Sequence, residues 1–367
     1  MTLLTPPPPA AKLALPRIAL GCMGFGASAW RPWVLDEAPS LEMLAQALDA
    51  GVTFFDTANV YSTGRSEALL GRLLRTAQAR ERVVVATKLF FPVGDGEIGL
   101  SRRNVLSSCD ASLQRLGIER IDLLQIHSFD DATPVEETMA ALHELVVAGK
   151  VAHLGASNLR AWQLAKMNFT ARANGWTEFE TVQAHYNLLY REEERELLPF
   201  CIDQGIAVLP WSPLARGRLA RPQDVLGTRR GEADDVADSL YGPPDDPVLD
   251  ALAALSAELG IAPAQLALAW LWTRPAVAAP VVGATALRHI TDALAASRLQ
   301  LPAEVFVPVE QAYRPRALAE LPKVARNQTV LTPAGALDDA SLRSAPSPMR
   351  MNTSASSSST PGTSTSE

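Results

Sequence analysis

The sequence has few cysteines and no cysteine pair of the kind that binds metal. Cys22, Cys109 and Cys201 are the three cysteines among 367 residues, and they are widely separated. An odd number of isolated cysteines is typical of a reducing compartment and excludes a cysteine-based zinc cluster. We therefore expect a cytoplasmic protein without a metal site.

Positive charge and long apolar runs are also scarce. The chain has 33 Lys and Arg residues against 40 Asp and Glu residues, a net charge of -7. It therefore has no overall positive field that would attract nucleic acid or an anionic membrane. No apolar run reaches the roughly 18 residues of a membrane-spanning helix, and prolines at 6–9 interrupt the region where a signal peptide needs a continuous apolar stretch. We expect neither secretion nor a membrane span.

The motifs of several common enzyme classes are missing. The glycines of GCMGFG at 21–26 are not in G-x-G-x-x-G order, so they do not predict a two-domain dehydrogenase. The sequence contains no G-x-x-x-x-G-K-[ST] phosphate loop, H-E-x-x-H pair or G-x-S-x-G elbow. An NTPase, a zinc peptidase and a serine hydrolase would therefore lack their central residues.

What the sequence does contain is a regular alternation of strands and helices. Eight apolar segments of strand length, rich in Val, Ile and Leu, lie at 17–21, 53–58, 83–90, 121–127, 151–157, 181–186, 206–213 and 280–284. Such near-continuous apolar strands are typical of a parallel sheet that is covered on both faces. Segments of helical period lie between them, at 41–48, 66–74, 101–116, 135–148, 161–173, 191–204 and 288–297.

This alternation fits either an open doubly wound sheet or a closed barrel. A polar insertion at 214–245 follows the seventh strand, and two further helices are expected within 247–273. A barrel takes such insertions easily, because they lie at its open C-terminal mouth. We therefore predict an α/β fold, a (β/α)8 TIM barrel. The charged run at 191–196 is interpreted as a solvated helix face.

The two ends of the chain have a different composition. Residues 1–16 are rich in proline, 352–367 are almost entirely Ser, Thr, Pro and Gly, and 313–351 has five prolines with few periodic apolar positions. Such segments bury too little apolar surface to offset the entropy of ordering. We predict a flexible N-terminal extension at 1–16, the barrel at 17–313 and a low-complexity, disordered tail at 314–367.

Polar residues follow several predicted strands, where a barrel enzyme carries its catalytic groups. Asp56 ends the second strand with Tyr61 just beyond it, Lys88 ends the third and His127 ends the fourth. Each residue taken alone has an ordinary structural role as a turn, surface or core residue. Their joint placement at consecutive strand ends favours a single site.

This set of residues suits the reduction of a carbonyl group. A phenol has a pKa of about 10, and a nearby ammonium group lowers it, so Lys88 could activate Tyr61. Asp56 would hold Lys88, and a neutral His127 could orient the substrate oxygen. These residues move only protons, so the hydride has to come from a nicotinamide.

Several segments resemble the aldo/keto reductase superfamily, over about residues 17–313. They are FFDTANVYSTGRSE at 54–67, ATK at 86–88, IDLLQIHSFD at 121–130, GASN at 155–158, QAHYNLLYRE at 183–192, PWSPLARGRL at 210–219 and PVVGAT at 280–285. Within the superfamily the chain is most similar to the aryl-alcohol-dehydrogenase-like branch, which includes bacterial members assigned to 1-deoxyxylulose-5-phosphate synthesis. The resemblance implies a (β/α)8 barrel that uses NADPH or NADP+ without metal or flavin.

The resemblance also assigns roles to individual residues. It implies that Tyr61 is the general acid in reduction and the general base in oxidation, with Lys88 and Asp56 setting its pKa and His127 orienting the carbonyl. Ser157, Asn158 and Gln183 match positions that bind the nicotinamide carboxamide, Trp211 one that stacks on its ring, and Gly24 one near its ribose. The matched cofactor-binding positions are Gly24, Asp56, Ser157, Asn158, Gln183, Trp211, Ser212, Pro213, Leu214, Arg216, Gly217, Gly283, Thr285, Arg288 and His289.

One departure from the family pattern concerns the choice of cofactor. Relatives usually have GATKPEH after the last strand, whereas this chain has GATALRH, with Ala286 where the lysine contacts the 2'-phosphate. Arg288 could supply the charge, assisted by Thr285 and by the N-terminal end of the following helix. We expect NADPH to be preferred over NADH.

The sequence thus predicts an NADP(H)-dependent reductase of small-molecule aldehydes and ketones, which would oxidise alcohols in reverse. The alternative is a cofactor-sensing regulatory subunit with slow turnover, as in potassium-channel β subunits that resemble this family. Trp30 and Trp33 could line a substrate pocket or only cover the barrel mouth. For a sugar phosphate, Arg102 or Arg103 is the candidate cation. The substrate and the oligomeric state stay open.

Overall fold

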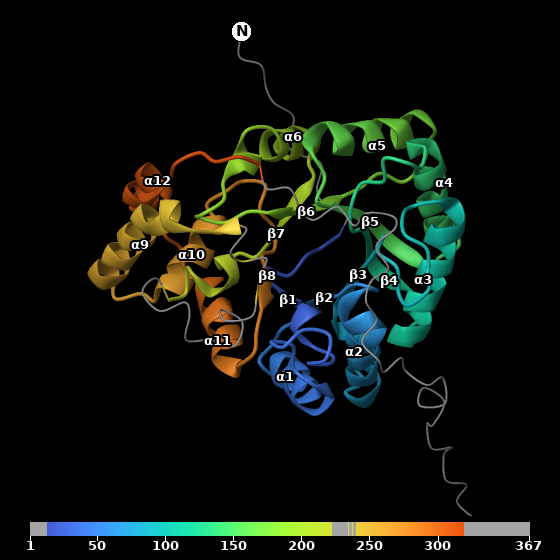
Figure 1. Ribbon diagram of the computed structural model, residues 1–367, viewed down its shortest axis with the longest axis horizontal. Helices are drawn as coiled ribbons and strands as arrows, with labels where there is room; N and C mark the ends of the chain where they lie inside the picture. The colour runs from blue at the N-terminus through green and yellow to red at the C-terminus, as the bar shows by residue number, and fades with distance from the viewer. Residues whose placement is uncertain (1–12, 222–233, 235–236, 238–239, 319–367) are drawn as a thin grey trace, which may run out of the picture. The chain divides into compact units, whose positions relative to one another are not determined.

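Eight parallel strands form a closed barrel in the computed structural model, which describes residues 13–221, 234, 237 and 240–318 (Figure 1). The strands follow one another around the barrel in chain order, and β1 pairs with both β2 and β8. They are β1 (Ala19–Gly21), β2 (Phe54–Asp56), β3 (Val84–Leu89), β4 (Ile121–Ile126), β5 (Val151–Ser157), β6 (Thr181–His185), β7 (Ala207–Trp211) and β8 (Val281–Gly283). The predicted (β/α)8 barrel is confirmed, with each strand inside or next to its predicted segment.

Helices surround the barrel, and their buried apolar side chains pack into one core cluster with side chains of the strands (Figure 1). They are α1 (Glu37–Asp49), α2 (Arg65–Thr76), α3 (Arg102–Leu116), α4 (Val135–Val147), α5 (Ala161–Ala173), α6 (Leu197–Gln204), α9 (Asp246–Leu259), α10 (Pro263–Leu271), α11 (Leu287–Ala296) and α12 (Val307–Ala312). Local signals fix several ends. For example, the Ser101 hydroxyl caps α3 by accepting from the Asn104 amide, and Gly117 ends it with a φ of 63°.

One predicted helix is divided in the structure. Residues 191–204 form a short 3-10 turn at Glu192–Glu194 followed by α6, instead of one continuous helix. The Glu192 side chain is only 2% exposed, and it accepts a hydrogen bond from the Tyr313 hydroxyl at 2.6 Å. The interpretation of 191–196 as a solvated helix face was therefore wrong at this residue. Its partner lies more than 100 positions away in the chain, and no local pattern reveals it.

The barrel interior has an apolar layer below and a polar layer above. Ala19, Phe54, Ala86, Leu123 and Leu209 belong to one buried cluster, together with Leu13, Ala279 and Val281. Side chains alternate along a strand, so residues two positions further point inward again, one layer higher. In this upper layer β2 contributes Asp56, β3 Lys88, β4 Gln125 and β6 Gln183, and all four are buried. The fold thus places the polar side chains at the C-terminal mouth of the barrel.

The described residues extend slightly into both predicted extensions. Leu13 packs in the lower barrel cluster, and Arg316 contacts residues of the 190s and 240s. The rest of the predicted extensions, 1–12 and 319–367, lies outside the described residues. In the predicted insertion at 214–245, residues 222–233, 235–236 and 238–239 also lie outside them. The chain divides into two units, Met1–Val330 and Leu331–Glu367, and every described residue belongs to the first.

No single helix of the described part is long and apolar enough to cross a membrane. Taken together, α9 and α10 reach the required length and composition, with a bend of 104° between them. Six consecutive residues of α10, Leu266 to Leu271, are buried in the protein core.

Candidate active site

A buried ion pair lies at the centre of the barrel mouth. The Lys88 side chain is fully buried, and its Nζ donates hydrogen bonds to Asp56 Oδ1 at 2.5 Å and to the Thr57 carbonyl at 2.8 Å. Asp56 comes from β2 and Lys88 from the neighbouring β3. A buried lysine is stable as a cation only when its charge is paired and its protons are hydrogen-bonded, and both conditions are met here.

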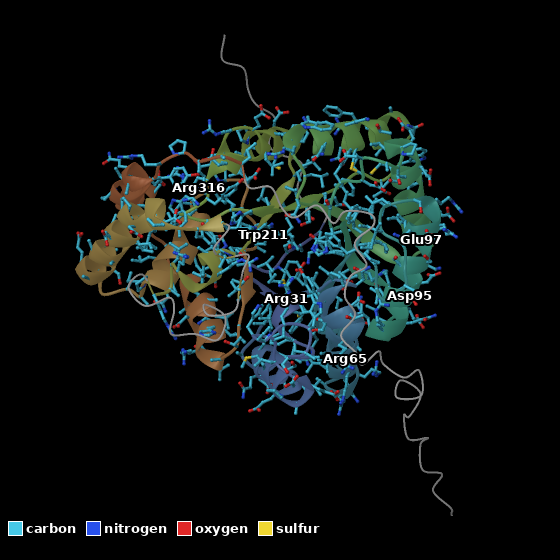
Figure 2. All side chains as sticks on the ribbon, viewed as in Figure 1. Arg31, Arg65, Asp95, Glu97, Trp211 and Arg316 are labelled. Carbon is cyan, nitrogen blue, oxygen red and sulfur yellow. The ribbon has the colours of Figure 1, made fainter. Side chains whose placement is uncertain are left out.

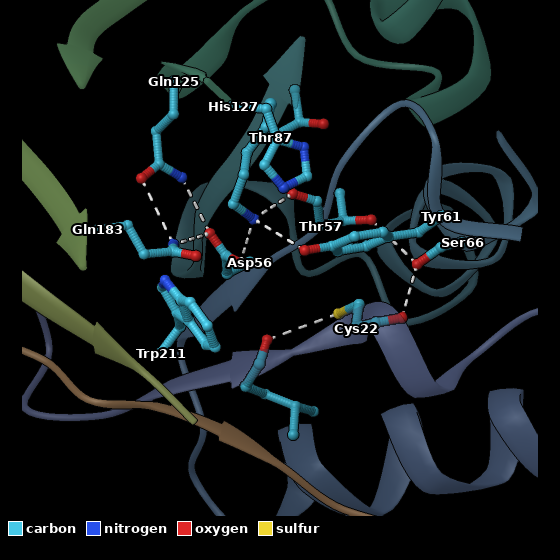
Figure 3. A network of polar contacts seen from close by, with 12 residues as sticks. Cys22, Asp56, Thr57, Tyr61, Ser66, Thr87, Gln125, His127, Gln183 and Trp211 are labelled. Atoms are coloured by element: carbon cyan, nitrogen blue, oxygen red, sulfur yellow. Dashed lines mark hydrogen bonds and ion pairs between the residues drawn. The ribbon is translucent and has the colours of Figure 1, made fainter. Parts of the chain in front are cut away.

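Two glutamines hold the second oxygen of Asp56. Gln125 Nε2 and Gln183 Nε2 each donate to Asp56 Oδ2 at 2.9 Å, and Figure 3 shows both amides converging on the carboxylate. Asp56 is therefore fixed by neighbours from β3, β4 and β6. Gln125 is not among the residues predicted from the sequence. Its signal is a lone polar residue in the run LLQI, and it pairs in register with Lys88.

Tyr61 lies beside this ion pair. Lys88 Nζ is 3.5 Å from the Tyr61 hydroxyl, which points toward the Asp56 carboxylate side of the site in Figure 3. Tyr61 begins a short 3-10 turn, Tyr61–Gly64, in which Ser62 and Thr63 have φ values of 48° and 55°. Such left-handed conformations cost about 1–3 kcal/mol each in a non-glycine residue. The surrounding structure therefore has to hold this turn, and the following helix α2 is anchored by a hydrogen bond from Ser66 Oγ to the Cys22 carbonyl at 2.8 Å.

His127 follows β4 and forms the other side of the site. Its ring lies edge-on to the Tyr61 ring, with centroids 5.8 Å apart, and edge-on to the Phe91 ring at 5.1 Å. The His127 carbonyl accepts from Asn158 Nδ2 at 3.0 Å. Its Nδ1 atom is buried and has no hydrogen-bond partner among the described residues. The structure thus brings together Asp56, Tyr61, Lys88 and His127, as the strand ends predicted.

The electrostatics of the site define the charge of each group. Burial raises the pKa of Tyr61, and Lys88 opposes this effect. Burial is the largest single effect on Lys88 and lowers its pKa, but the charge interactions and hydrogen bonds with Asp56 and Tyr61 together raise that pKa above its ordinary value. Burial and the neighbouring Lys88 cation hold the pKa of His127 well below its usual value. At neutral pH the site therefore contains a phenol, an ammonium and a neutral imidazole.

Lys88 acts on Tyr61 with the predicted sign, because it lowers the pKa of the phenol. The sequence did not predict the opposing effect of burial, which is larger and raises the Tyr61 pKa above its ordinary value. The positions of the strand ends predict which side chains lie close together. The effect of burial on the Tyr61 pKa depends on all the residues that pack around its ring, and the strand ends do not reveal these.

Next to these residues lies a flat aromatic surface. Trp211 ends β7, its indole Nε1 donates to Asn158 Oδ1 at 2.9 Å, and its ring is only partly buried. Asn158 follows β5 in a left-handed conformation with a φ of 59°. The neighbouring Ser157 hydroxyl is buried and has no hydrogen-bond partner among the described residues. An indole face, a free hydroxyl and nearby amides match what a planar aromatic carboxamide requires.

The residues predicted along the pyrophosphate form a tight loop after β7. Ser212, Ala215 and Arg216 have φ values of 49°, 47° and 57°, and Gly217 has 104°. Arg216 forms an ion pair with Asp234, whose side chain is 1% exposed. Pro213 is buried, and Leu214 packs against the core. The loop backbone therefore takes a defined, sharply turned course beside Trp211.

Basic residues gather around the start of α11. Gly283, the last residue of β8, and Thr285 are exposed, and the Thr285 amide donates to His289 Nδ1 at 3.3 Å. Burial and the cations Arg288 and Arg221 lower the pKa of His289. Arg221, which the sequence analysis missed, thus lies near Arg288 although 67 positions separate them in the chain. A Cβ atom on Gly24, at the end of the turn after β1, would meet no other atom within 4 Å.

The remaining candidate residues differ in their surroundings. Trp30 is partly exposed, with its ring 6.4 Å from that of Tyr61, whereas Trp33 is only 4% exposed. Trp30 therefore adjoins the site, and Trp33 is a core residue. Arg102 pairs with Glu144 at 2.7 Å. Arg103 pairs with Glu97, so neither arginine is an uncompensated cation.

Comparison with known proteins agrees with this architecture. The model of the aldo/keto reductase family matches residues 17–314. The chain is 38% identical to versiconal hemiacetal acetate reductase of Aspergillus parasiticus over 330 residues, which cover 83% of this chain and 96% of that protein. It is 37% identical to a putative aryl-alcohol dehydrogenase of Schizosaccharomyces pombe over 331 residues, which cover 83% and 93%.

The fold, the site and these matches define an oxidoreductase built on a (β/α)8 barrel. The chain belongs to the aldo/keto reductase family. An aldo-keto reductase of Fusarium vanettenii, 38% identical over 82% of this chain and 88% of that protein, is a further relative. The resemblance seen in the sequence, including the similarity to aryl-alcohol dehydrogenases, is thereby confirmed. Members of the family act on small-molecule carbonyl substrates.

Proposed function

We propose that the protein is an NADP(H)-dependent reductase that converts aldehydes and ketones to alcohols. The observation that carries this proposal is the position of the Tyr61 hydroxyl, 3.5 Å from the Lys88 amine and beside the His127 ring. A protonated phenol, a fixed cation and a neutral imidazole at one mouth can accept and protonate a developing alkoxide.

The chain's own residues would act as follows. The neutral His127 would donate a hydrogen bond to the substrate oxygen and orient the carbonyl beside Tyr61. Tyr61 would give its proton to that oxygen, and Lys88, held by Asp56, would stabilise the phenolate that remains. In the oxidation direction the phenolate would take the proton back. A bound nicotinamide supplies the hydride for the carbonyl carbon.

The residues beside Trp211 fit a nicotinamide cofactor. The partner-free Ser157 hydroxyl, Asn158 and Gln183 offer hydrogen bonds of the kind that a carboxamide group makes, and the exposed face of Trp211 offers a stacking surface. The loop of Ser212, Pro213, Leu214, Arg216 and Gly217 would follow the pyrophosphate, with Gly24 and Gly283 leaving room for close approach.

A preference for NADPH over NADH is supported by the charges at α11. Arg288, Arg221 and the N-terminal end of this ten-residue helix provide a positive field near Thr285 and His289. A 2'-phosphate bound there would be compensated although Ala286 replaces the usual lysine.

The walls of the site favour aromatic or apolar carbonyl substrates. Trp30 packs against Tyr61 and Phe91 packs against His127, so each of these two side chains has an aromatic neighbour. Arg102 and Arg103 are each paired with an acid, which offsets the positive charge that a sugar phosphate would meet there.

A carbonyl screen tests this function. Purified protein is mixed with NADPH or NADH and a panel of aromatic, aliphatic and sugar-derived aldehydes, and oxidation is followed by nicotinamide fluorescence. We expect multiple turnovers, fastest with NADPH and an aromatic aldehyde. Tight NADPH binding with less than one turnover on every substrate would contradict the proposal and favour a cofactor-sensing protein.

A further inference from the structure

Trp211 is the outer member of a stack of three aromatic rings. The His185 imidazole lies 4.3 Å from the Trp211 ring with an interplanar angle of 12°, and 4.2 Å from the Tyr190 ring with an angle of 13°. His185 and Tyr190 are buried, whereas Trp211 is partly exposed. The position of the Trp211 face therefore depends on the ring of His185 beneath it.

His185 is itself held from the side by Tyr241. Its Nε2 atom and the Tyr241 hydroxyl are 2.6 Å apart. Asn187 joins the same group, because its Nδ2 donates to the Tyr241 hydroxyl at 3.0 Å and to the Ser212 carbonyl at 2.9 Å. Burial and the cations Arg216 and Arg316 lower the pKa of His185 to about 3, so the ring stays neutral and keeps one acceptor nitrogen.

Tyr241 depends in turn on a residue beyond the barrel. Arg316 Nη1 donates to the carbonyl of Leu240, the residue before Tyr241, at 2.7 Å. The same guanidinium pairs with Asp245, which is 1% exposed, and the Arg316 amide donates to Glu192 Oε1 at 2.8 Å. Figure 2 shows Arg316 next to the part of the barrel that carries Trp211. Arg316 thus fastens the segment 240–245 against the loop that follows β6.

We propose that Arg316 is a positioning residue for the cofactor-stacking surface, acting through Tyr241 and His185 on Trp211. The inference rests on the proposed nicotinamide site but adds a residue that the family match does not include, since that match ends at residue 314. Loss of Arg316 removes the link to Leu240 and leaves the Asp245 carboxylate buried without this cation. Tyr241 can then shift, and the His185 ring loses its fixed orientation below Trp211.

The test compares four variants of the full chain, Arg316→Ala, Tyr241→Phe, the double variant and Arg314→Ala. Arg314 is the matched control, because it is exposed and its side chain donates hydrogen bonds to the carbonyls of Gln311 and Tyr313, within its own segment of the chain. The readouts are the NADPH Kd from nicotinamide fluorescence, kcat and KM with one aldehyde, and circular dichroism at the assay temperature to verify folding.

We expect Arg316→Ala to raise the NADPH Kd by about tenfold, the effect of losing one charge-assisted hydrogen bond, while kcat at saturating cofactor stays within about twofold. Tyr241→Phe should raise the Kd similarly. The Kd of the double variant should not exceed the higher of the two single-variant values, because both changes break the same chain of contacts. Arg314→Ala should bind as the wild type does.

Two results would overturn the inference. One is an unchanged Kd in folded Arg316→Ala; the other is a double variant whose Kd rises by the product of the two single effects. If Arg316→Ala does not fold, Arg316→Lys replaces it. Lysine keeps a cation for Asp245, but its single nitrogen cannot occupy both positions from which the two guanidinium nitrogens reach Asp245 and the Leu240 carbonyl. An unchanged Kd in Arg316→Lys or in Tyr241→Phe would then contradict the proposal. A wild-type protein that binds neither NADPH nor NADH would instead contradict the proposed function.

Discussion

The ion pair between Lys88 and Asp56 has two consequences at the scale of single residues. It keeps a cation inside the protein, and it fixes that cation beside the Tyr61 hydroxyl. Both groups are buried, so neither can be solvated by water if its partner is removed. The same contacts that support the proposed proton transfer are therefore also needed for stability.

Replacing Lys88 with Met should show how much the ion pair contributes to stability. The variant leaves the Asp56 carboxylate buried with only amide partners, so the free energy of unfolding should fall by about 3–5 kcal/mol. The matched control is Arg72→Met, because Arg72 pairs with Glu37 on the surface, where the side chains are 53% and 60% exposed. In that variant the free energy of unfolding should fall by less than about 1 kcal/mol. Equal losses in the two variants, measured by urea denaturation, would contradict the proposed burial of the pair.

His185 predicts a specific dependence of stability on pH. Its pKa is about 3 in the folded protein, against 6.5 for an unperturbed histidine. Between these values the unfolded chain takes up a proton that the folded protein does not, so the free energy of unfolding falls as the pH falls below about 6.5. At pH 5 the loss from this group should be about 2 kcal/mol relative to pH 7. Urea denaturation of the wild type and of His185→Gln at the two pH values tests this. The variant should lose less of its free energy of unfolding than the wild type by that amount, and identical losses in the two proteins would refute the prediction.

At the scale of elements, the turn that carries Tyr61 is held by close packing against the loop after β1. Gly26 has a φ of 150°, and a Cβ atom there would lie 2.2 Å from Ser62 Oγ, next to Tyr61. The Ser62 hydroxyl also accepts from the Ala27 amide at 3.3 Å. The two loops therefore form one unit, and the position of the phenol depends on both.

Gly26→Ala should move Ser62 and with it Tyr61. We expect kcat to fall by about tenfold, because a small displacement of a proton donor has a large effect on rate. Gly51→Ala is the control: Gly51 has a similarly unusual φ of 98°, but a Cβ atom there meets nothing within 4 Å. It should lose stability without a comparable loss of kcat. Equal kcat values in the two variants, each checked for folding, would show that this contact does not position Tyr61.

The start of α11 determines the choice of cofactor in this account. Arg288→Ala should raise the KM for NADPH by about tenfold, the effect of one lost charge-assisted contact, and leave the KM for NADH nearly unchanged. Arg298→Ala, on the exposed end after α11, is the control. Steady-state kinetics with both cofactors give the result, and a KM for NADH that rises in parallel would contradict a 2'-phosphate site.

At the scale of the whole molecule, the barrel brings distant strand ends to one mouth. The sequence was sufficient to predict this architecture, because all eight strands are apolar and each is followed by a helical segment. It was also sufficient to predict the meeting of Asp56, Tyr61, Lys88 and His127, since parallel strands end on the same side of a barrel. The barrel topology brings the ends of β2, β3 and β4 together, whereas the position of Tyr61 also depends on the turn beyond β2.

Other features could not be predicted from the sequence, for identifiable reasons. Gln125 lies in an apolar run, and its inward direction depends on the register of β4 against β3. The seventh strand ends at Trp211 instead of 213, because Ser212 adopts a left-handed conformation. The contact of Arg316 with Leu240 joins positions 76 apart with no local signal. Such features depend on register, backbone conformation and long-range packing, which periodicity does not encode.

The central claim for the molecule as a whole is that the Tyr61 hydroxyl transfers the proton. The same hydroxyl is expected to take no part in binding the cofactor. The most direct test is Tyr61→Phe, with single-turnover reduction of an aldehyde and the NADPH Kd measured on the same preparation. We predict that the rate falls by at least about a hundredfold, the usual contribution of a general acid, while the Kd stays within about twofold. A Tyr61→Phe protein that reduces aldehydes at the wild-type rate would contradict the account.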